Sequence, residues 1–274
     1  MRLIHAPSRP AKPGRLFAAA AAMCVAASIA APADAQFVQP GFDDDPISAL
    51  GTNDGSRSQV LPFDVNIGGT TFDTVVANNN GVLSFGGSFE PYQIDTLDNL
   101  AVASNRVLIA PFYANVDTSP LGSGNYNGGI ASLGLGNVDG RSAFGVTWDR
   151  VGFSDEQDNL LSTFQVLIVD RSDINSGDFD IVFNYDDIEW TAADPADLAA
   201  QVGVATPDGS ALLLDVFESN HVCSDASFVA AFDVPGTYTI PVRSGRLGVT
   251  IVPSPTAAAA GLLGLVAIAG RRRR

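Results

Sequence analysis

The feature that most limits the fold is a side-chain alternation with a period of two residues, which recurs between residues 60 and 248. In residues 144–148, and again in residues 179–185, a large apolar side chain stands at every second position. Successive side chains of a strand point to opposite faces of a sheet, so this pattern predicts strands with one buried face. Residues 164–169 are apolar on both faces, which favours a central strand between two layers.

Turn-forming residues separate these runs at short intervals. Combinations of Asn or Asp with Gly occur in residues 78–81, 137–140, 175–178 and 207–209. Gly, Asn and Asp tolerate the positive φ that tight reversals require. Residues 195–201 alone are predicted to be helical. The sequence therefore predicts an all-β fold, an antiparallel β-sandwich-like single domain with a minor helix, although the strand order does not follow from the pattern.

The first 35 residues have the parts of a secretory signal peptide. Residues 1–15 are basic and contain no acid, residues 16–31 are apolar, and Ala33 and Ala35 form an A-x-A cleavage pattern. We expect a signal peptidase to cut before Gln36 and the chain to be exported. Residues 36–59, polar and rich in Gly and Asp, are expected to form a loose polar arm before a domain over residues 60–250.

The other end combines a proline-rich motif, a 14-residue apolar stretch over residues 257–270, and an arginine cluster. The residues concerned are Val252, Pro253, Ser254, Pro255, Arg271, Arg272, Arg273 and Arg274. Together, residues 251–274 resemble the PEP-CTERM class of bacterial C-terminal sorting signals, with Ser254 in place of the usual glutamate.

The PEP-CTERM resemblance implies an exosortase-type membrane peptidase as a second processing partner. It also implies transient insertion in the inner membrane and a final location at the cell surface of a Gram-negative-type bacterium, or secreted from it. A 14-residue helix covers only about 21 Å of a hydrocarbon core about 30 Å thick, so we expect a transient C-terminal hydrophobic helix rather than a permanent anchor.

The charge of the body limits its partners and its chemistry. Between residues 36 and 252 there are seven basic residues, all arginine, and 29 acidic ones, a net charge near −22. Such a surface repels phosphate backbones, so no nucleic-acid partner is expected. This part of the chain contains one histidine, His221, and one cysteine, Cys223, which argues against a disulfide scaffold, a structural zinc site or a Ser-His-Asp hydrolase. No catalytic residue is predicted.

Five phrases of the body resemble the nidogen-like extracellular (NIDO) domain in their order and rough spacing. They are VANNNGVLSFG (76–86), IAPFYANVDT (109–118), VTW (146–148), TFQVL (163–167) and IVFNYDDIEWT (181–191), followed by the region of Gly203. The resemblance covers residues 60–219, with Asn115 where an aspartate is common. It implies a non-enzymatic extracellular-matrix or adhesion module that mediates cell-matrix adhesion, with an extracellular polysaccharide or a matrix protein as partner.

Carboxylates are the abundant reactive groups, and Asp outnumbers Glu by 26 to 4. Short carboxylates on loops suit calcium, the one cofactor considered, and the candidate ligands are Asp117, Asp155, Asp158, Asp186 and Asp187. Two alternatives to adhesion stay open on this basis, a carboxylate-dependent glycan hydrolase and a calcium-dependent carbohydrate-binding module. Trp148 and Trp190 could stack on a sugar ring, but their place in alternating strands favours the core.

Overall fold

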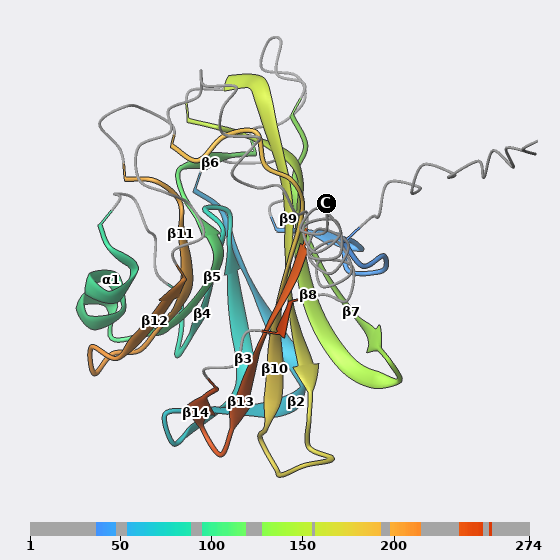
Figure 1. Cartoon of the computed structure of the whole chain (residues 1–274), viewed down its shortest axis with the longest axis vertical. Coiled ribbons are helices and arrows are strands. Elements are labelled where there is room, and N and C mark those ends of the chain that lie inside the picture. Colours follow the sequence, from blue (N-terminus) through green and yellow to red (C-terminus); the bar gives the residue numbers. More distant parts are fainter. Residues whose placement is uncertain are drawn as a thin grey trace, which may run out of the picture. The chain divides into compact units, whose positions relative to one another are not determined.

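The computed structural model describes residues 37–47, 54–88, 95–118, 128–154, 157–192, 198–214, 236–248 and 252–253 (Figure 1). The predicted signal peptide with Ala33, Ala35 and Gln36 lies outside these residues. So do Asp155, His221, Cys223 and the predicted sorting tail from Ser254 onward. No helix within the described ranges is long and apolar enough to cross a membrane.

Two antiparallel sheets form the domain (Figure 1). Sheet A runs in the order β1 (Asp45–Pro46), β7 (Ala131–Val138), β8 (Arg141–Phe153), β9 (Gln157–Asp170), β10 (Phe179–Asp187), β13 (Gly236–Arg243) and β14 (Arg246–Leu247). In addition, β6 (Val116–Asp117) pairs with β8, and β15 (Val252–Pro253) pairs with β13. Sheet B runs in the order β12 (Ala211–Leu214), β11 (Gln201–Ala205), β5 (Val107–Tyr113), β4 (Val82–Phe85), β3 (Thr70–Asn78) and β2 (Ser56–Ile67).

This architecture confirms the all-β antiparallel sandwich expected from the alternation. The runs 144–148 and 179–185 lie in β8 and β10, and the run 164–169, expected to be central, lies in β9 with β8 and β10 on its two sides. Its register places Gln165 opposite Thr147 on one side and opposite Asn184 on the other.

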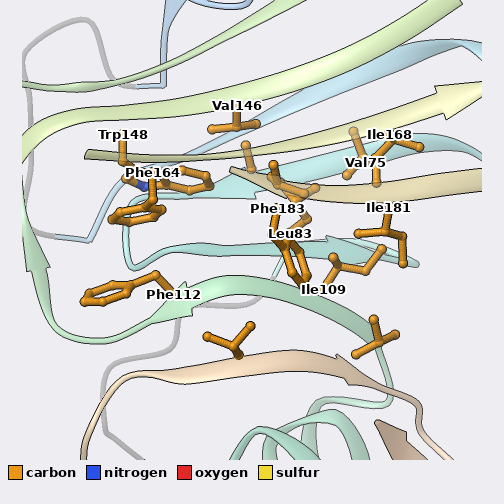
Figure 2. Close-up of a cluster of buried hydrophobic side chains, with 14 of the residues drawn as sticks. Val75, Leu83, Ile109, Phe112, Val146, Trp148, Phe164, Ile168, Ile181 and Phe183 are labelled. Carbon is orange, nitrogen blue, oxygen red and sulfur yellow. The ribbon is translucent and has the colours of Figure 1, made fainter. Parts of the chain in front are cut away.

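The core fills the space between the two sheets, and Figure 2 shows side chains from both of them pointing toward one another. Aromatic rings are packed at one end of it. Trp148 stacks on Phe164 with ring centres 4.9 Å apart, and Phe112 lies 4.8 Å from Phe164 and 5.1 Å from Trp190. Trp148 and Trp190 are 0% and 1% exposed, which confirms that both are core residues rather than sugar-stacking platforms.

The helix lies elsewhere than the sequence predicts. α1 (Leu97–Ser104) covers the outer face of sheet B, where Leu97 and Ala101 belong to a cluster with residues of β4, β5 and β11. In the predicted helix over residues 195–201, the described residues 198–200 are irregular and Gln201 begins β11, so the prediction is wrong there. Gln201 instead serves α1, because its Oε1 accepts the N–H of Leu97 at 2.8 Å and its Nε2 donates to the carbonyl of Asp95 at 3.1 Å.

The described part of the expected polar arm is also packed rather than loose. Phe42 is 2% exposed and Ile47 is 4% exposed, and β1 pairs with β7 between them. The strand β2 begins at Ser56, within the stretch expected to precede the domain. Burial of Phe42 and Ile47, together with the pairing of β1 and β7, therefore docks this polar stretch on sheet A.

One glycine of the β3–β4 turn has no room for a side chain. Gly81 has φ +75°, and a Cβ there would lie 1.8 Å from the carbonyl oxygen of Phe112. Gly140, in the β7–β8 turn, has nearly the same φ, +76°, but no atom within 4 Å of the corresponding position. The two positions therefore separate the cost of the backbone conformation from the cost of a steric clash.

We expect Gly81→Ala to lower the free energy of unfolding by about 3 to 5 kcal/mol, because it adds a clash with β5 to an unfavourable φ. Gly140→Ala should cost only about 1 to 2 kcal/mol, the cost of the left-handed conformation alone. Denaturant unfolding of both variants beside the wild type measures the difference. Equal losses at the two positions would contradict the packing of this turn against β5.

Candidate functional site

The turn between β3 and β4, which carries the NNNG phrase, makes several buried hydrogen bonds to the other sheet. Asn79 donates from Nδ2 to the carbonyl of Val116 at 3.1 Å and accepts the hydroxyl of Thr118 at Oδ1. Its backbone carbonyl accepts the indole N–H of Trp148 at 2.8 Å. One residue of sheet B's turn therefore binds three residues on the side of sheet A.

The next residue makes a parallel set of contacts. Asn80 accepts the backbone N–H of Val116 at Oδ1 (3.0 Å) and donates from Nδ2 to Asp54 (3.2 Å). Its carbonyl accepts the N–H of Ala114 at 3.3 Å. Asn78, Asn79 and Asn80 are 1%, 1% and 3% exposed. The asparagine turn, residues 78–81, is therefore a structural connection whose asparagine side chains are buried within the domain.

Two further buried side chains, Tyr185 and Trp190, donate hydrogen bonds to backbone carbonyls. The hydroxyl of Tyr185 in β10 donates to the carbonyl of Pro111 in β5 at 2.6 Å, and the indole of Trp190 donates to Val151 at 3.1 Å. Burial raises the pKa of Tyr185 well above its ordinary value, with a smaller contribution from Tyr238. Tyr185 therefore keeps its proton and remains a donor.

The structure places the four described calcium candidates in two regions. Asp117, in β6, is 1% exposed and lies opposite Gly152 of β8. Asp158 follows Gln157, which lies opposite Phe153 on the other side of β8. Asp117 and Asp158 thus flank the same end of β8.

Asp186 and Asp187 lie at the end of β10, where Asp187 is opposite Thr163 of β9. Burial, and then the charges of Glu189 and Asp186, raise the pKa of Asp187. In the part of the chain that the structure describes, no three His, Cys, Asp or Glu side chains are grouped so as to hold a metal ion. Calcium binding stays a prediction, because Asp155 is outside this part.

A surface groove at the edge of sheet B is the feature best suited to binding. It consists of two adjoining hollows of about 580 and 420 Å³, which share Phe72 and Gly86. The larger hollow is lined by aromatic, hydroxyl and charged side chains. Those on which the argument depends are Thr70, Phe72, Phe85, Arg106, Thr206 and Asp208. The smaller hollow continues along β2 and β3 with Ser56, Ser58, Thr71 and Thr74.

Arg106 stands between the two hollows. Its side chain lies over two glycines, since a Cβ on Gly86 would be 3.5 Å from its Cδ and a Cβ on Gly87 would be 3.1 Å from its Nη2. Nη1 donates to the carbonyl of Asn105 at 3.1 Å, and Nε is buried without a hydrogen-bond partner. Among the ion pairs found within the described ranges, none includes Arg106. Among the residues that the structure describes, no carboxylate therefore occupies the guanidinium of Arg106.

Asp208 lies in the loop between β11 and β12, on the lining of the same hollow. Hydrogen bonds from the Thr206 hydroxyl, and then from Ser210, lower its pKa, so it is ionised under ordinary conditions. The groove thus presents one cation, Arg106, two carboxylates, Asp73 and Asp208, and the aromatic ring of Phe72. We did not expect these residues from the sequence, because Phe72, Arg106 and Asp208 lie far apart along the chain and follow no spacing rule.

Comparison with known proteins identifies the family. A family model described as the nidogen-like domain matches residues 73–243, from β3 to the end of β13. The chain belongs to the nidogen-like domain family. The family resemblance seen in the five phrases is thereby confirmed, and the matched residues include strands of both sheets.

Two relatives are informative. Alpha-tectorin from Mus musculus is 30% identical over 156 residues, which cover 51% of this chain and 7% of that protein. Nidogen from Drosophila melanogaster is 27% identical over 165 residues, which cover 52% of this chain and 12% of that protein. The chain therefore corresponds to a small part of these relatives, and this part is a domain of extracellular-matrix type. No solved structure matches the chain.

The raised pKa of Asp187 predicts a pH-dependent effect on stability. The folded state binds the Asp187 proton more tightly than the unfolded state does, so ionisation disfavours folding as pH rises from the unfolded value near 3.9 through the raised pKa. We expect Asp187→Asn to raise the free energy of unfolding at pH 7 by less than about 1 kcal/mol, because this side chain is only partly buried, and so to raise the melting temperature slightly. The substitution should have no effect near pH 3.

Asp208→Asn is the matched control, since its pKa is lowered rather than raised. Its carboxylate favours the folded state above the unfolded pKa, and this contribution is lost as pH falls. The substitution should therefore lower the melting temperature at pH 7 and lose its effect in acid. Thermal unfolding of both variants between pH 3 and pH 7 measures this. The same sign for both at pH 7 would contradict the opposite pKa shifts.

Proposed function

We propose that this protein is an exported, non-enzymatic surface or extracellular-matrix protein, and that its nidogen-like domain mediates cell-matrix adhesion. The observation that carries the proposal is the family match over residues 73–243, supported by the likeness to alpha-tectorin and nidogen. The residues that resemble the family make contacts within the domain, as the buried asparagine turn does. A partner would therefore bind to other residues at the surface, and adhesion needs no activated side chain.

The groove around Arg106 is the surface that we assign to this function. A stretch of extracellular polysaccharide or of a matrix protein can lie along the two hollows. Phe72 and the hydroxyls of Thr70 and Thr206 provide apolar and polar contacts. The guanidinium of Arg106 would donate to an oxygen of the polymer, the type of charge-assisted hydrogen bond that gives orientation as well as affinity.

We expect Arg106→Ala to weaken retention of the protein on matrix isolated from its host by about 10- to 100-fold. This corresponds to the loss of a hydrogen bond to a charged group, about 1.5 to 3 kcal/mol. Arg246→Ala is the control, because Arg246 is exposed in β14 and does not line the groove. A sedimentation assay over a range of matrix concentrations measures retention. Equal retention of the wild type and both variants would refute the assignment of the groove.

Matrix isolated from the host also allows adhesion to be distinguished from glycan hydrolysis. The raised pKa of Asp187 beside Glu189 and Asp186 is the observation that favours a hydrolase, because a general acid needs such a shift. A hydrolase would release soluble sugars from the matrix and would stop doing so in Asp187→Asn. Adhesion predicts retention without release and the same retention in this variant.

For export we propose removal of the signal peptide before Gln36 and processing of the PEP-CTERM-like tail by an exosortase-type peptidase at the inner membrane. The intact mass of the protein from surface and culture fractions of its host should correspond to a chain that begins at Gln36 and lacks Arg271–Arg274. A chain that keeps the four arginines and occurs only in the membrane fraction would show instead that the tail is a lasting anchor.

A further inference from the structure

The outer face of sheet A has a slot that three glycines leave open. Gly134 and Gly136 lie in β7, and Gly145 lies in β8 directly opposite Gly134. The ring of Phe42 fills this slot: a Cβ on Gly136 would be 3.0 Å from the ring, and a Cβ on Gly145 would be 2.6 Å from it. A Cβ on Gly134 would be 2.7 Å from the Cα of Phe42. Any larger residue at these positions would exclude Phe42.

The buried side-chain amide of Gln165 holds the backbone of Gln39, three residues before Phe42. Gln165, in β9, is 0% exposed; its Oε1 accepts the N–H of Gln39 at 3.0 Å, and its Nε2 donates to the carbonyl of Gln39 at 2.9 Å. The amide thus pairs with both backbone groups of one residue, as a neighbouring strand would.

Further side chains fix the orientation of that amide. Gln165 donates to Thr147 at 2.9 Å and accepts from Asn184 at 2.8 Å, and Asn184 in turn accepts the hydroxyl of Thr237 at 2.7 Å. These four residues form a row across β8, β9, β10 and β13, in the register of the strand pairs. The bonds within the row do not involve Gln39, so the orientation of the Gln165 amide is set by residues of sheet A itself.

The segment that docks here, residues 37–47, is called the strap below. Its other end is held by the pairing of β1 with β7, by a hydrogen bond from Ile47 to Ala131 at 2.9 Å, and by Arg57, which binds Asp45 at 3.2 Å and the carbonyl of Pro46 at 2.9 Å. Only the six residues 48–53 connect the strap to the next described residue, Asp54. If cleavage occurs before Gln36, only three residues precede Gln39, so the strap would begin next to the N-terminus of the mature chain.

We propose that the slot and the Gln165 amide form a receptor for the strap of a second copy of this chain, so that copies join by exchanging straps. A strap in the slot of a second copy makes the same contacts as a strap in the slot of its own chain. The exchanged and unexchanged arrangements therefore differ mainly in chain entropy. A short connection gives the strap an effective concentration on the order of millimolar at its own slot. Exchange therefore becomes important where the protein is concentrated, as on a surface, and each copy then acts as donor and acceptor.

Two complementary variants of the full chain test the exchange without high concentration. Phe42→Asp leaves the slot open but places a carboxylate where only an apolar ring fits, so its strap cannot seat. Gly134→Val blocks the slot but keeps the strap, because the three atoms nearest to its added Cβ all belong to strap residues Phe42 and Gly41. Each variant alone should be monomeric at micromolar concentration.

When the two variants are mixed, we expect a one-to-one dimer in native mass spectrometry and light scattering. The double variant Phe42→Asp/Gly134→Val should form no dimer with either. If the mixture stays monomeric while both variants unfold cooperatively, the proposal is wrong. Retention on matrix through Arg106 is a separate measurement, so failure of one proposal leaves the other standing.

A peptide measurement keeps the proposal testable if Gly134→Val does not fold. A synthetic peptide of residues 37–47 should bind the Phe42→Asp chain, and the same peptide carrying Phe42→Ala should bind at least about 10-fold more weakly, since an aromatic side chain contributes well over 1.4 kcal/mol on burial. The milder Gly136→Ala chain can then replace Gly134→Val as donor, because its nearest added contacts are also strap atoms. Equal binding of both peptides would overturn the assignment of the slot.

Discussion

The buried amide of Asn79 is the interaction on which the rest of the sandwich depends. It lies in a turn of sheet B, yet its partners, Val116 and Thr118, belong to the side of sheet A, and Trp148 binds its backbone. A buried polar group without its partner costs more than the bond itself contributes, so each sheet restricts where the other can lie. The close approach of Gly81 to β5 is a consequence of this arrangement.

This constraint explains why the residues that resemble the family do not identify a ligand. The asparagine turn, Tyr185 and the two tryptophans make contacts within the domain, and they are almost wholly buried. They specify how two sheets meet. The surfaces open to a partner lie outside this interior: the groove around Arg106 at the edge of sheet B, and the strap on the outer face of sheet A. A shared interior is thus compatible with different partners.

The helix and the strap show why parts of the structure escape sequence reasoning. Residues 198–201 have helix-forming composition, but Gln201 pairs with Tyr113 and caps α1, so tertiary contacts override local preference. The strap looks polar because its two buried apolar side chains, Phe42 and Ile47, are separated by three aspartates and a proline. The slot for Phe42 is made by glycines more than 90 positions away, and a glycine in a strand does not reveal by itself what approaches it.

By itself, the sequence determined the features that follow from local periodicity and composition: the antiparallel β class, the central position of β9, the burial of Trp148 and Trp190, and the likeness to the nidogen-like family. An alternation of side chains reports which face of a strand is buried, and this is a property of neighbouring residues. Only the tertiary structure decided the strand order, the position of the helix, the groove around Arg106 and the slot for Phe42. Each of these brings together residues from distant parts of the chain, and their pairing depends on how the two sheets pack rather than on any spacing along the sequence.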